Sequence, residues 1–260
     1  GNKIRKYDTW HAMGQGATTG SLVVTLEALK EMHLTPEDIQ LIQNDTKTCP
    51  DTGMAGASRS LYMDGNATII AANKLLAAMR KEDGTLRTYD EMKAEGIETK
   101  YLGRYETNTT PGLCRLDPNT GIGDPTPAFT YCLNLAEVEV DTKTGKTTVL
   151  KFTCVDFVGR IGNIDAVNGQ AYSGIMHGIG FALKEDYADV KKHANMFGAG
   201  TSYIKDVPDD INLIHIDGAI SDGPFGSSGA SEAFQASGHC AVLNGIYNAC
   251  GVRIHEIPAL

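Results

Sequence analysis

The chain is organised around the segment D-G-P-F-G-S-S-G-A-S-E-A-F, which runs from Asp222 to Phe234. Glu232 is the only charged residue between Asp222 and His239. Glycine and other small residues allow a backbone to approach a ligand closely. A carboxylate that faces a bound cofactor with little water around it has a raised pKa, which suits it to proton transfer. The alternative is a flexible loop with a solvated glutamate, and the loop taken alone favours that alternative.

A second small-residue loop lies closer to the N-terminus. Gly14, Gln15 and Gly16 follow a predicted strand at residues 3–8 and precede a predicted helix. N–H groups at a helix start can bind an anion, but a lone G-x-G is weak support, and a plain turn before a core helix is the alternative. The helix is indicated by apolar residues at helical spacing, Leu22, Leu26 and Leu29, with Val23 and Met32 widening the face.

A third small-residue loop spans residues 51–60, after a turn at 35–38 and a predicted buried strand at 39–42. A long helix follows the loop and begins either at Ser58 or after Gly65. An arginine adds charge-assisted hydrogen bonds, so this loop is a better phosphate site than the first, although a capped helix with a solvated arginine is equally compatible. The candidate phosphate-binding residues are Ala55, Gly56, Ala57, Ser58, Arg59 and Ser60, and the apolar face of the helix comprises Ile69, Ala72, Leu76 and Met79.

The second half of the chain follows a polar excursion over about residues 81–127, which contains one short predicted helix at 88–93. Residues 128–140 and 147–158 are predicted to form two strands joined by a hairpin turn. A further strand is predicted at 211–216. The last helix is predicted to run from a cap at Ser237 to a stop at Gly251.

A glycine-rich helix is predicted at residues 163–183. Gln170, Gly174 and His177 lie at i, i+4 and i+7, so they share one face. Glycines cost helix stability, which indicates that something packs against the bare backbone. Gln170 then either hydrogen-bonds a bound group or is satisfied inside a tight helix–helix contact, and the local sequence slightly favours the second.

Composition narrows the function classes. The chain has 260 residues, 42% of them hydrophobic, and a formal net charge of −9, which is ordinary for a globular protein. Without a basic run we expect no nucleic acid as partner, although one small anionic cofactor is not excluded. No apolar run is long enough for a membrane span, and residues 1–7 lack the apolar segment of a signal peptide, so we expect a cytoplasmic protein without a membrane partner.

The six cysteines are scattered and contain no C-x-x-C pair. This spacing is typical neither of a zinc or iron–sulfur site nor of a dense disulfide framework, so we expect reduced thiols and no metal ligand from this chain. Neither a phosphate-loop signature nor a Rossmann signature is present, which argues against an unrelated nucleotide-binding protein.

Taken together, in this order, the three loops and the glycine-rich helix resemble motifs of the molybdenum hydroxylases, the aldehyde oxidase and xanthine dehydrogenase family. The likeness is greatest to bacterial aldehyde oxidoreductases that use molybdopterin cytosine dinucleotide, and it extends over essentially the whole chain. The matching segments are M-G-Q-G at 13–16, G-M-A-G-A-S-R at 53–59, G-Q-A-Y-S-G at 169–174, D-G-P-F-G-S-S-G at 222–229 followed by Glu232, and N-G-I-Y-N-A-C-G-V-R at 244–253.

The resemblance implies an α+β fold of two packed α/β lobes, with residues 1–260 as the C-terminal part of the molybdopterin-binding domain and no separable linker. It implies that the enzyme hydroxylates an aldehyde or N-heterocycle with water as the oxygen source. Glu232 would be the catalytic base. Gln15, in a turn bounded by Gly14 and Gly16, would hydrogen-bond the pterin, and so would Gln170. Residues 55–60 would hold phosphate.

The resemblance also implies partners. The cofactor would be molybdopterin with molybdenum, in the cytosine dinucleotide form. Iron–sulfur centres would lie only in domains or subunits outside this chain. The N-terminal half of the molybdenum domain would be a further partner, on the same polypeptide or as a separate subunit, and a homodimer is compatible with this arrangement.

Two departures from the family pattern bear on activity. The family reads G-E-x-P around its base, whereas this chain has Ser231 before Glu232 and Phe234 two residues after it. The serine adds a side chain beside the base, and losing the proline is expected to loosen the following turn. A degenerate scaffold or binding module that keeps the fold without the chemistry is therefore the alternative function.

Overall fold

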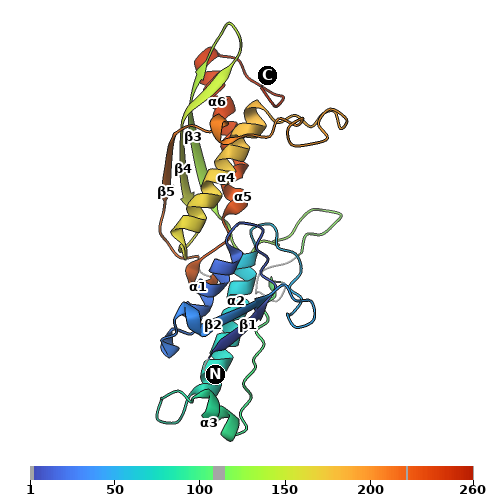
Figure 1. Cartoon of the computed structure of the whole chain (residues 1–260). Coiled ribbons are helices and arrows are strands. Elements are labelled where there is room, and N and C mark those ends of the chain that lie inside the picture. The colour runs from blue at the N-terminus through green and yellow to red at the C-terminus, as the bar shows by residue number, and fades with distance from the viewer. Residues whose placement is uncertain (1–2, 108–114, 221, 260) are drawn as a thin grey trace. The chain divides into compact units, whose positions relative to one another are not determined.

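The computed structural model describes residues 3–107, 115–220 and 222–259, and the chain divides into two compact units (Figure 1). The first comprises Gly1–Phe129, Gly159–Asn163 and Ala219–Gly229. The second comprises Thr130–Val158, Ile164–Gly218 and Ala230–Leu260. The predicted α+β class is confirmed, because each unit combines helices with a small sheet. That residues 1–260 act as a single cofactor-binding portion stays a prediction.

The first unit contains a two-stranded parallel sheet and three helices. The predicted strands appear as β1 (Ile4–Asp8) and β2 (Ile39–Gln43), paired with Ile4 opposite Ile39. The helices are α1 (Ala17–Ala28), α2 (Ser60–Met79) and α3 (Tyr89–Ala94). Single turns of 3₁₀ helix lie at η1 (Lys30–Met32), η2 (Pro36–Asp38) and η5 (Pro224–Gly226).

The predicted apolar face of α1 is wrong. The helix ends at Ala28 and buries Ala17, Ser21, Val24 and Thr25 rather than the leucines. The two hydroxyl side chains can be buried because both are hydrogen-bonded: Thr25 Oγ1 donates to the Ser21 carbonyl at 2.7 Å, and Ser21 Oγ donates to Asp8 Oδ2 at 2.6 Å. Leu29 is buried just after the helix, against Ala72 and Leu76 of α2.

The start of α2 settles one of the alternatives left by the sequence. The helix begins at Ser60, directly after the third loop, and Gly65 lies inside it. A Cβ at Gly65 would lie 2.6 Å from Pro224 Cγ, so the glycine permits close contact with the segment 219–229. The helix therefore retains Gly65 despite its intrinsic cost because another part of the first unit packs on its bare backbone.

The second unit is a three-stranded sheet with helices against one face (Figure 1). The predicted hairpin is confirmed as β3 (Tyr131–Val140) and β4 (Thr147–Phe157), and β5 (Asp210–His215) pairs parallel with β4. The helices are α4 (Ile164–Leu183), α5 (Ser231–Ala236) and α6 (Gly238–Cys250), with one 3₁₀ turn at η4 (Ile204–Asp206).

Each end of α6 tests a prediction. Gly251 follows the helix with φ 73°, the left-handed stop expected from the sequence. Ser237 occupies the N-cap position, but its side chain makes no capping hydrogen bond. Its Oγ instead accepts a hydrogen bond from Asn134 Nδ2 at 3.0 Å, so a contact with β3 replaces the predicted cap.

The two faces of this sheet differ in their surroundings. Phe152, Cys154 and Asp156 of β4 are buried on the face that the helices cover. The opposite face is apolar yet exposed, and its large side chains are Tyr131, Leu133, Leu135, Ile214 and Ile216. Pairing makes this face continuous, because Leu133 lies opposite Val155 and Val155 lies opposite Ile214.

Candidate functional site

The turn at residues 14–16 is shaped by two glycines. Gly14 has φ 105° and Gly16, the N-cap of α1, has φ 86°, values that side-chain-bearing residues rarely adopt. The Gln15 amide closes its own turn: Oε1 accepts from the Met13 N–H at 2.5 Å and Nε2 donates to the His11 carbonyl at 2.6 Å. A pterin contact from Gln15 would therefore have to replace or extend these two hydrogen bonds.

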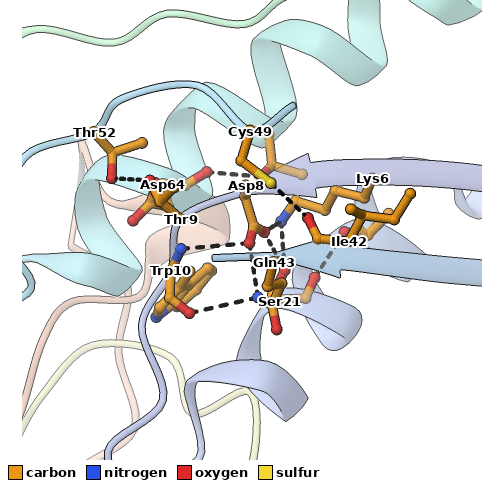
Figure 2. Close-up of polar contacts among 12 residues, drawn as sticks. Lys6, Asp8, Thr9, Trp10, Ser21, Ile42, Gln43, Cys49, Thr52 and Asp64 are labelled. Atoms are coloured by element: carbon orange, nitrogen blue, oxygen red, sulfur yellow. Dashed lines mark hydrogen bonds and ion pairs between the residues drawn. The ribbon is translucent and has the colours of Figure 1, made fainter. Parts of the chain in front are cut away.

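A buried polar cluster anchors the chain just before this turn (Figure 2). Asp8 forms an ion pair with Lys6 at 2.9 Å and accepts hydrogen bonds from Ser21 Oγ at 2.6 Å and Gln43 Nε2 at 2.7 Å. The Trp10 N–H also donates to Asp8 Oδ1, at 3.4 Å. One carboxylate thus links β1, β2 and α1 and holds the backbone that leads into the turn.

Burial and charge shape the acid–base behaviour of this cluster. Burial lowers the pKa of the Lys6 ammonium from its usual value, although Asp8 opposes the shift. Burial alone would raise the pKa of Asp8, but Lys6 and the hydrogen bonds from Ser21 and Gln43 outweigh it, so the pKa lies below its usual value. Asp64 of α2, drawn beside the cluster in Figure 2, has its pKa raised to about 6, first by burial and then by the charge of Asp8.

Residues 55–60 form the candidate anion cradle. Ala57 and Ser58 have φ values of 53° and 50°, left-handed conformations that cost about 1–3 kcal/mol each in a residue other than glycine and that concentrate at functional sites. The Arg59 N–H donates to the Gly56 carbonyl at 3.2 Å. Within the described residues, the N–H groups of Gly56 and Ala57 donate to no backbone carbonyl. Successive N–H groups in such a turn form a concavity that suits phosphate.

The loop at residues 222–229 packs directly on this cradle within the first unit. A Cβ at Gly229 would lie 1.7 Å from the Ser58 carbonyl oxygen, so only glycine fits there. Asn66 Nδ2 of α2 donates to the Asp222 carbonyl at 3.1 Å, and Ser227 Oγ donates to the Arg160 carbonyl at 2.6 Å. The structure thus brings together two of the loops that the sequence singled out.

The remaining candidate residues lie on helices of the second unit. Gln170 is partly buried on α4, and Glu232 is exposed at the second position of α5. The predicted tight packing on the α4 glycines is found: a Cβ at Gly174 would lie 2.5 Å from Phe234 Cβ. Phe234 itself is 0% exposed, so a buried side chain anchors the segment after Glu232, and the loosening expected from the missing proline stays a prediction.

Gln15 and Ser58 belong to the first unit, whereas Gln170 and Glu232 belong to the second. Each unit is described by itself, so a concave surface shared by these four residues stays a prediction. Glu232 is exposed within this chain, and its shielding from water by a bound cofactor stays a prediction.

The sequence reasoning missed the cluster of Lys6, Asp8 and Ser21. A usable signal was present: Lys6 and Asp8 lie two residues apart in a predicted strand, so both point to the same face. Two opposite charges on one face of a short strand indicate a buried ion pair if that face is covered.

Over residues 3–107, 115–220 and 222–259, no group of three or more His, Cys, Asp or Glu side chains could hold a metal ion. Within the same ranges, none of the helices is long and apolar enough to cross a membrane.

Comparison with known proteins adds an independent line of support. Residues 3–208 match the family model of a molybdopterin cofactor-binding domain. The chain is 41% identical over 256 residues to an aldehyde oxidoreductase of Megalodesulfovibrio gigas, covering 98% of this chain and 28% of that protein. It is 28% identical over 262 residues to a probable hypoxanthine oxidase of Escherichia coli, covering 95% and 27% of the two chains.

Solved structures agree. The aldehyde oxidoreductase of Desulfovibrio desulfuricans superimposes with a TM-score of 0.94 at 44% identity, over 99% of this chain and 28% of that one. This chain therefore spans 27–28% of the length of these three relatives. On the family model and these identities, the chain belongs to the molybdopterin cofactor-binding domains of the molybdenum hydroxylases.

Proposed function

We propose that the protein containing this chain is a molybdenum hydroxylase that oxidises an aldehyde or N-heterocycle with water as the oxygen source. The observation that carries the proposal is the contact of Gly229 with Ser58, which joins the segment before the proposed base to the proposed phosphate loop. A scaffold without chemistry is not favoured, because the matched relatives named above are an aldehyde oxidoreductase and a probable hypoxanthine oxidase.

The loop at 55–60 fits the phosphates of the cofactor. The N–H groups of Gly56 and Ala57 and the guanidinium of Arg59, the N-cap residue of α2, are the donors that we assign to them. The N-terminus of the 20-residue helix α2 adds the positive end of its dipole. We propose a dinucleotide form of molybdopterin with a cytosine base, in line with the likeness to bacterial aldehyde oxidoreductases.

The amides of Gln15 and Gln170 are proposed to hydrogen-bond the pterin. Each side chain offers both a donor and an acceptor, which suits the mixed donor and acceptor edge of a pterin ring. Gln15 is already oriented by Met13 and His11, so its amide plane is fixed before any ligand binds.

Glu232 is proposed as the general base. When bound, the molybdenum cofactor would supply oxygen transfer to the substrate and accept the pair of electrons released. Glu232 would accept, on one carboxylate oxygen, the proton lost as the oxygen nucleophile attacks the substrate carbon. It lies at the second position of the short helix α5, directly after a loop of small residues.

We further propose that other domains or subunits, among them iron–sulfur domains and the N-terminal half of the molybdenum domain, cover parts of this chain. The exposed apolar face of β3, β4 and β5 supports this, because such a continuous patch is unfavourable in water. A groove of about 2590 Å³ in the first unit, lined by residues 3–8 and part of α2, also supports it. That volume exceeds the roughly 300–1,000 Å³ of small-molecule pockets and suits a polypeptide segment.

The test is Glu232→Gln in the full-length, cofactor-loaded protein. Glutamine keeps the size of the side chain but cannot accept the proton, so we expect kcat to fall about 10²- to 10⁴-fold with unchanged molybdenum content. Glu139→Gln, the same change at an exposed position of β3, is the matched control and should leave kcat unchanged. Glu232→Gln activity above about a tenth of wild type would contradict the assignment.

A further inference from the structure

The geometry of Glu232 depends on what holds the helix that carries it. α5 has six residues, Ser231–Ala236. A helix this short is not stable by itself in water, because the cost of nucleation is not recovered by so few hydrogen bonds. Contacts with neighbouring elements of the second unit must therefore fix its position.

One such contact is the packing of Phe234 against α4. The side chain is 0% exposed, and a Cβ at Gly174 would come within 2.5 Å of Phe234 Cβ and 2.8 Å of the Phe234 carbonyl carbon. One turn later, a Cβ at Gly178 would lie 2.8 Å from Gly238 Cα. Gly174 contacts Phe234 and Gly178 contacts Gly238, so α4 and the segment 234–238 run in the same direction. We infer that the first turn of α5 lies alongside the turn of α4 that contains Gln170.

The second contact comes from Asn134 of β3. Its Nδ2 donates to the Phe234 carbonyl at 3.3 Å and to Ser237 Oγ at 3.0 Å, so one amide group holds the last turn of α5 and the residue after it. A backbone carbonyl can only accept, which settles which end of the Asn134 amide faces α5. Cys132 Sγ lies 3.7 Å from Asn134 Oδ1, in position to donate to its other end.

We propose that Asn134 is a positioning residue for Glu232. Asn134 fixes the end of α5, and the packing of Phe234 against Gly174 fixes the rotation of α5 about its axis. The Glu232 carboxylate is thereby held at one place relative to Gln170. The proposal rests on the proposed role of Glu232 as the base. It explains how this chain holds the base with phenylalanine at the position where the family pattern has proline.

The experiment uses the full-length, cofactor-loaded protein with Asn134→Asp. The substitution keeps the shape of the side chain but replaces the donor with an oxygen that faces the Phe234 carbonyl. We expect kcat to fall about 5- to 100-fold, the range for a misplaced catalytic group. Molybdenum content should be unchanged, and hydrogen exchange should be faster over residues 231–236. Asn119→Asp, the same change at an exposed position outside the sheet, is the matched control and should leave kcat unchanged.

A double-mutant comparison separates positioning from a structural role. If Asn134 acts through Glu232, Asn134→Asp should lower kcat less than 2-fold in a Glu232→Gln background, because the base is already absent. An equal fold-loss in both backgrounds would overturn the proposal. So would unchanged hydrogen exchange over residues 231–236.

Two further points keep the test decisive. Ser237→Ala removes one acceptor and leaves the Phe234 bond, so it should give a smaller effect of the same kind if Asn134→Asp does not fold. Failure of the proposed function would be visible separately, as full activity of the single Glu232→Gln variant. Hydrogen exchange over residues 231–236 would still decide whether Asn134 holds α5.

Discussion

Asp64 is a carboxylate whose surroundings penalise its charge. Burial is the first cause and the charge of Asp8 the second, and Lys6, Arg59 and His11 only partly compensate, so its pKa rises from 3.8 to about 6. It also lines a small hollow with Thr52, Ala55 and Arg59, directly beside the proposed phosphate loop.

The raised pKa predicts a pH-dependent gain from Asp64→Asn. Between pH 3.8 and about 6 the folded protein binds more protons at Asp64 than the unfolded chain does, so stability falls as pH rises through this window. Asp64→Asn removes this loss of stability, because asparagine does not titrate. After discounting for partial exposure we expect a gain of about 1 kcal/mol at pH 7.5 and little at pH 4.

Thermal unfolding of the purified chain at the two pH values measures this gain, which corresponds to roughly 2–4 °C. Asp217→Asn is the matched control, since Asp217 is exposed. A shift of equal size at pH 4 and pH 7.5 would show that the charge of Asp64 is not the cause.

The loop before α2 is the element that should bind an anion without help from the rest of the protein. Its donors are expected to converge because Ala57 and Ser58 both have left-handed backbone conformations. We expect inorganic pyrophosphate to bind the purified chain. Arg59→Ala should raise its dissociation constant about 10-fold, which corresponds to the loss of one or two hydrogen bonds to a charged group.

Isothermal titration measures both constants, and Arg5→Ala on β1 is the control for general loss of positive charge. An equal rise in the dissociation constant with both substitutions would mean that pyrophosphate binding depends only on overall charge. The assignment of the loop to phosphate would then be wrong.

Elements with a local signal could be predicted from the sequence. The hairpin of β3 and β4 has alternating residues and a six-residue turn, and the loops before α1 and α2 have runs of small residues. The face of α1 could not be predicted, because Ser21 is buried only where Asp8 of β1 receives its hydroxyl. The link from Asn134 to α5 joins residues 100 and 103 positions apart, which no local pattern reveals.

The candidate site was predictable only in part, for a similar reason. Motif spacing pointed to Ser58 and to the loop ending at Gly229, and these two do meet. Nothing in the sequence indicated that Phe234 would be fully buried where the family pattern has a proline. Proline holds a turn by restricting its backbone, whereas phenylalanine can hold it only by side-chain packing. That packing depends on the rest of the fold.

At the scale of the whole molecule, the exposed apolar sheet face and the large groove of the first unit imply that the chain functions within something larger. We therefore predict that the chain purified alone carries no molybdenum and oxidises no aldehyde. A large cofactor is held by many converging contacts, and this chain spans only 28% of the aldehyde oxidoreductases that it matches.

Elemental analysis of the purified chain, with the full-length protein as control, measures the molybdenum content directly. Stoichiometric molybdenum in the chain alone would show that these residues suffice to enclose the cofactor. The proposal that other domains complete the site would then be wrong.

The packing of Gly229 on Ser58 also sets an order of events during synthesis. The phosphate loop leaves the ribosome about 170 residues before the segment that completes it, since Ser58 and Gly229 are that far apart in the chain. At roughly 5–20 residues per second, the wait is on the order of 10–30 s. For that time Ser58 and the bare face of α2 at Gly65 lack their cover, so the first unit cannot complete its packing until residues 219–229 have been synthesised.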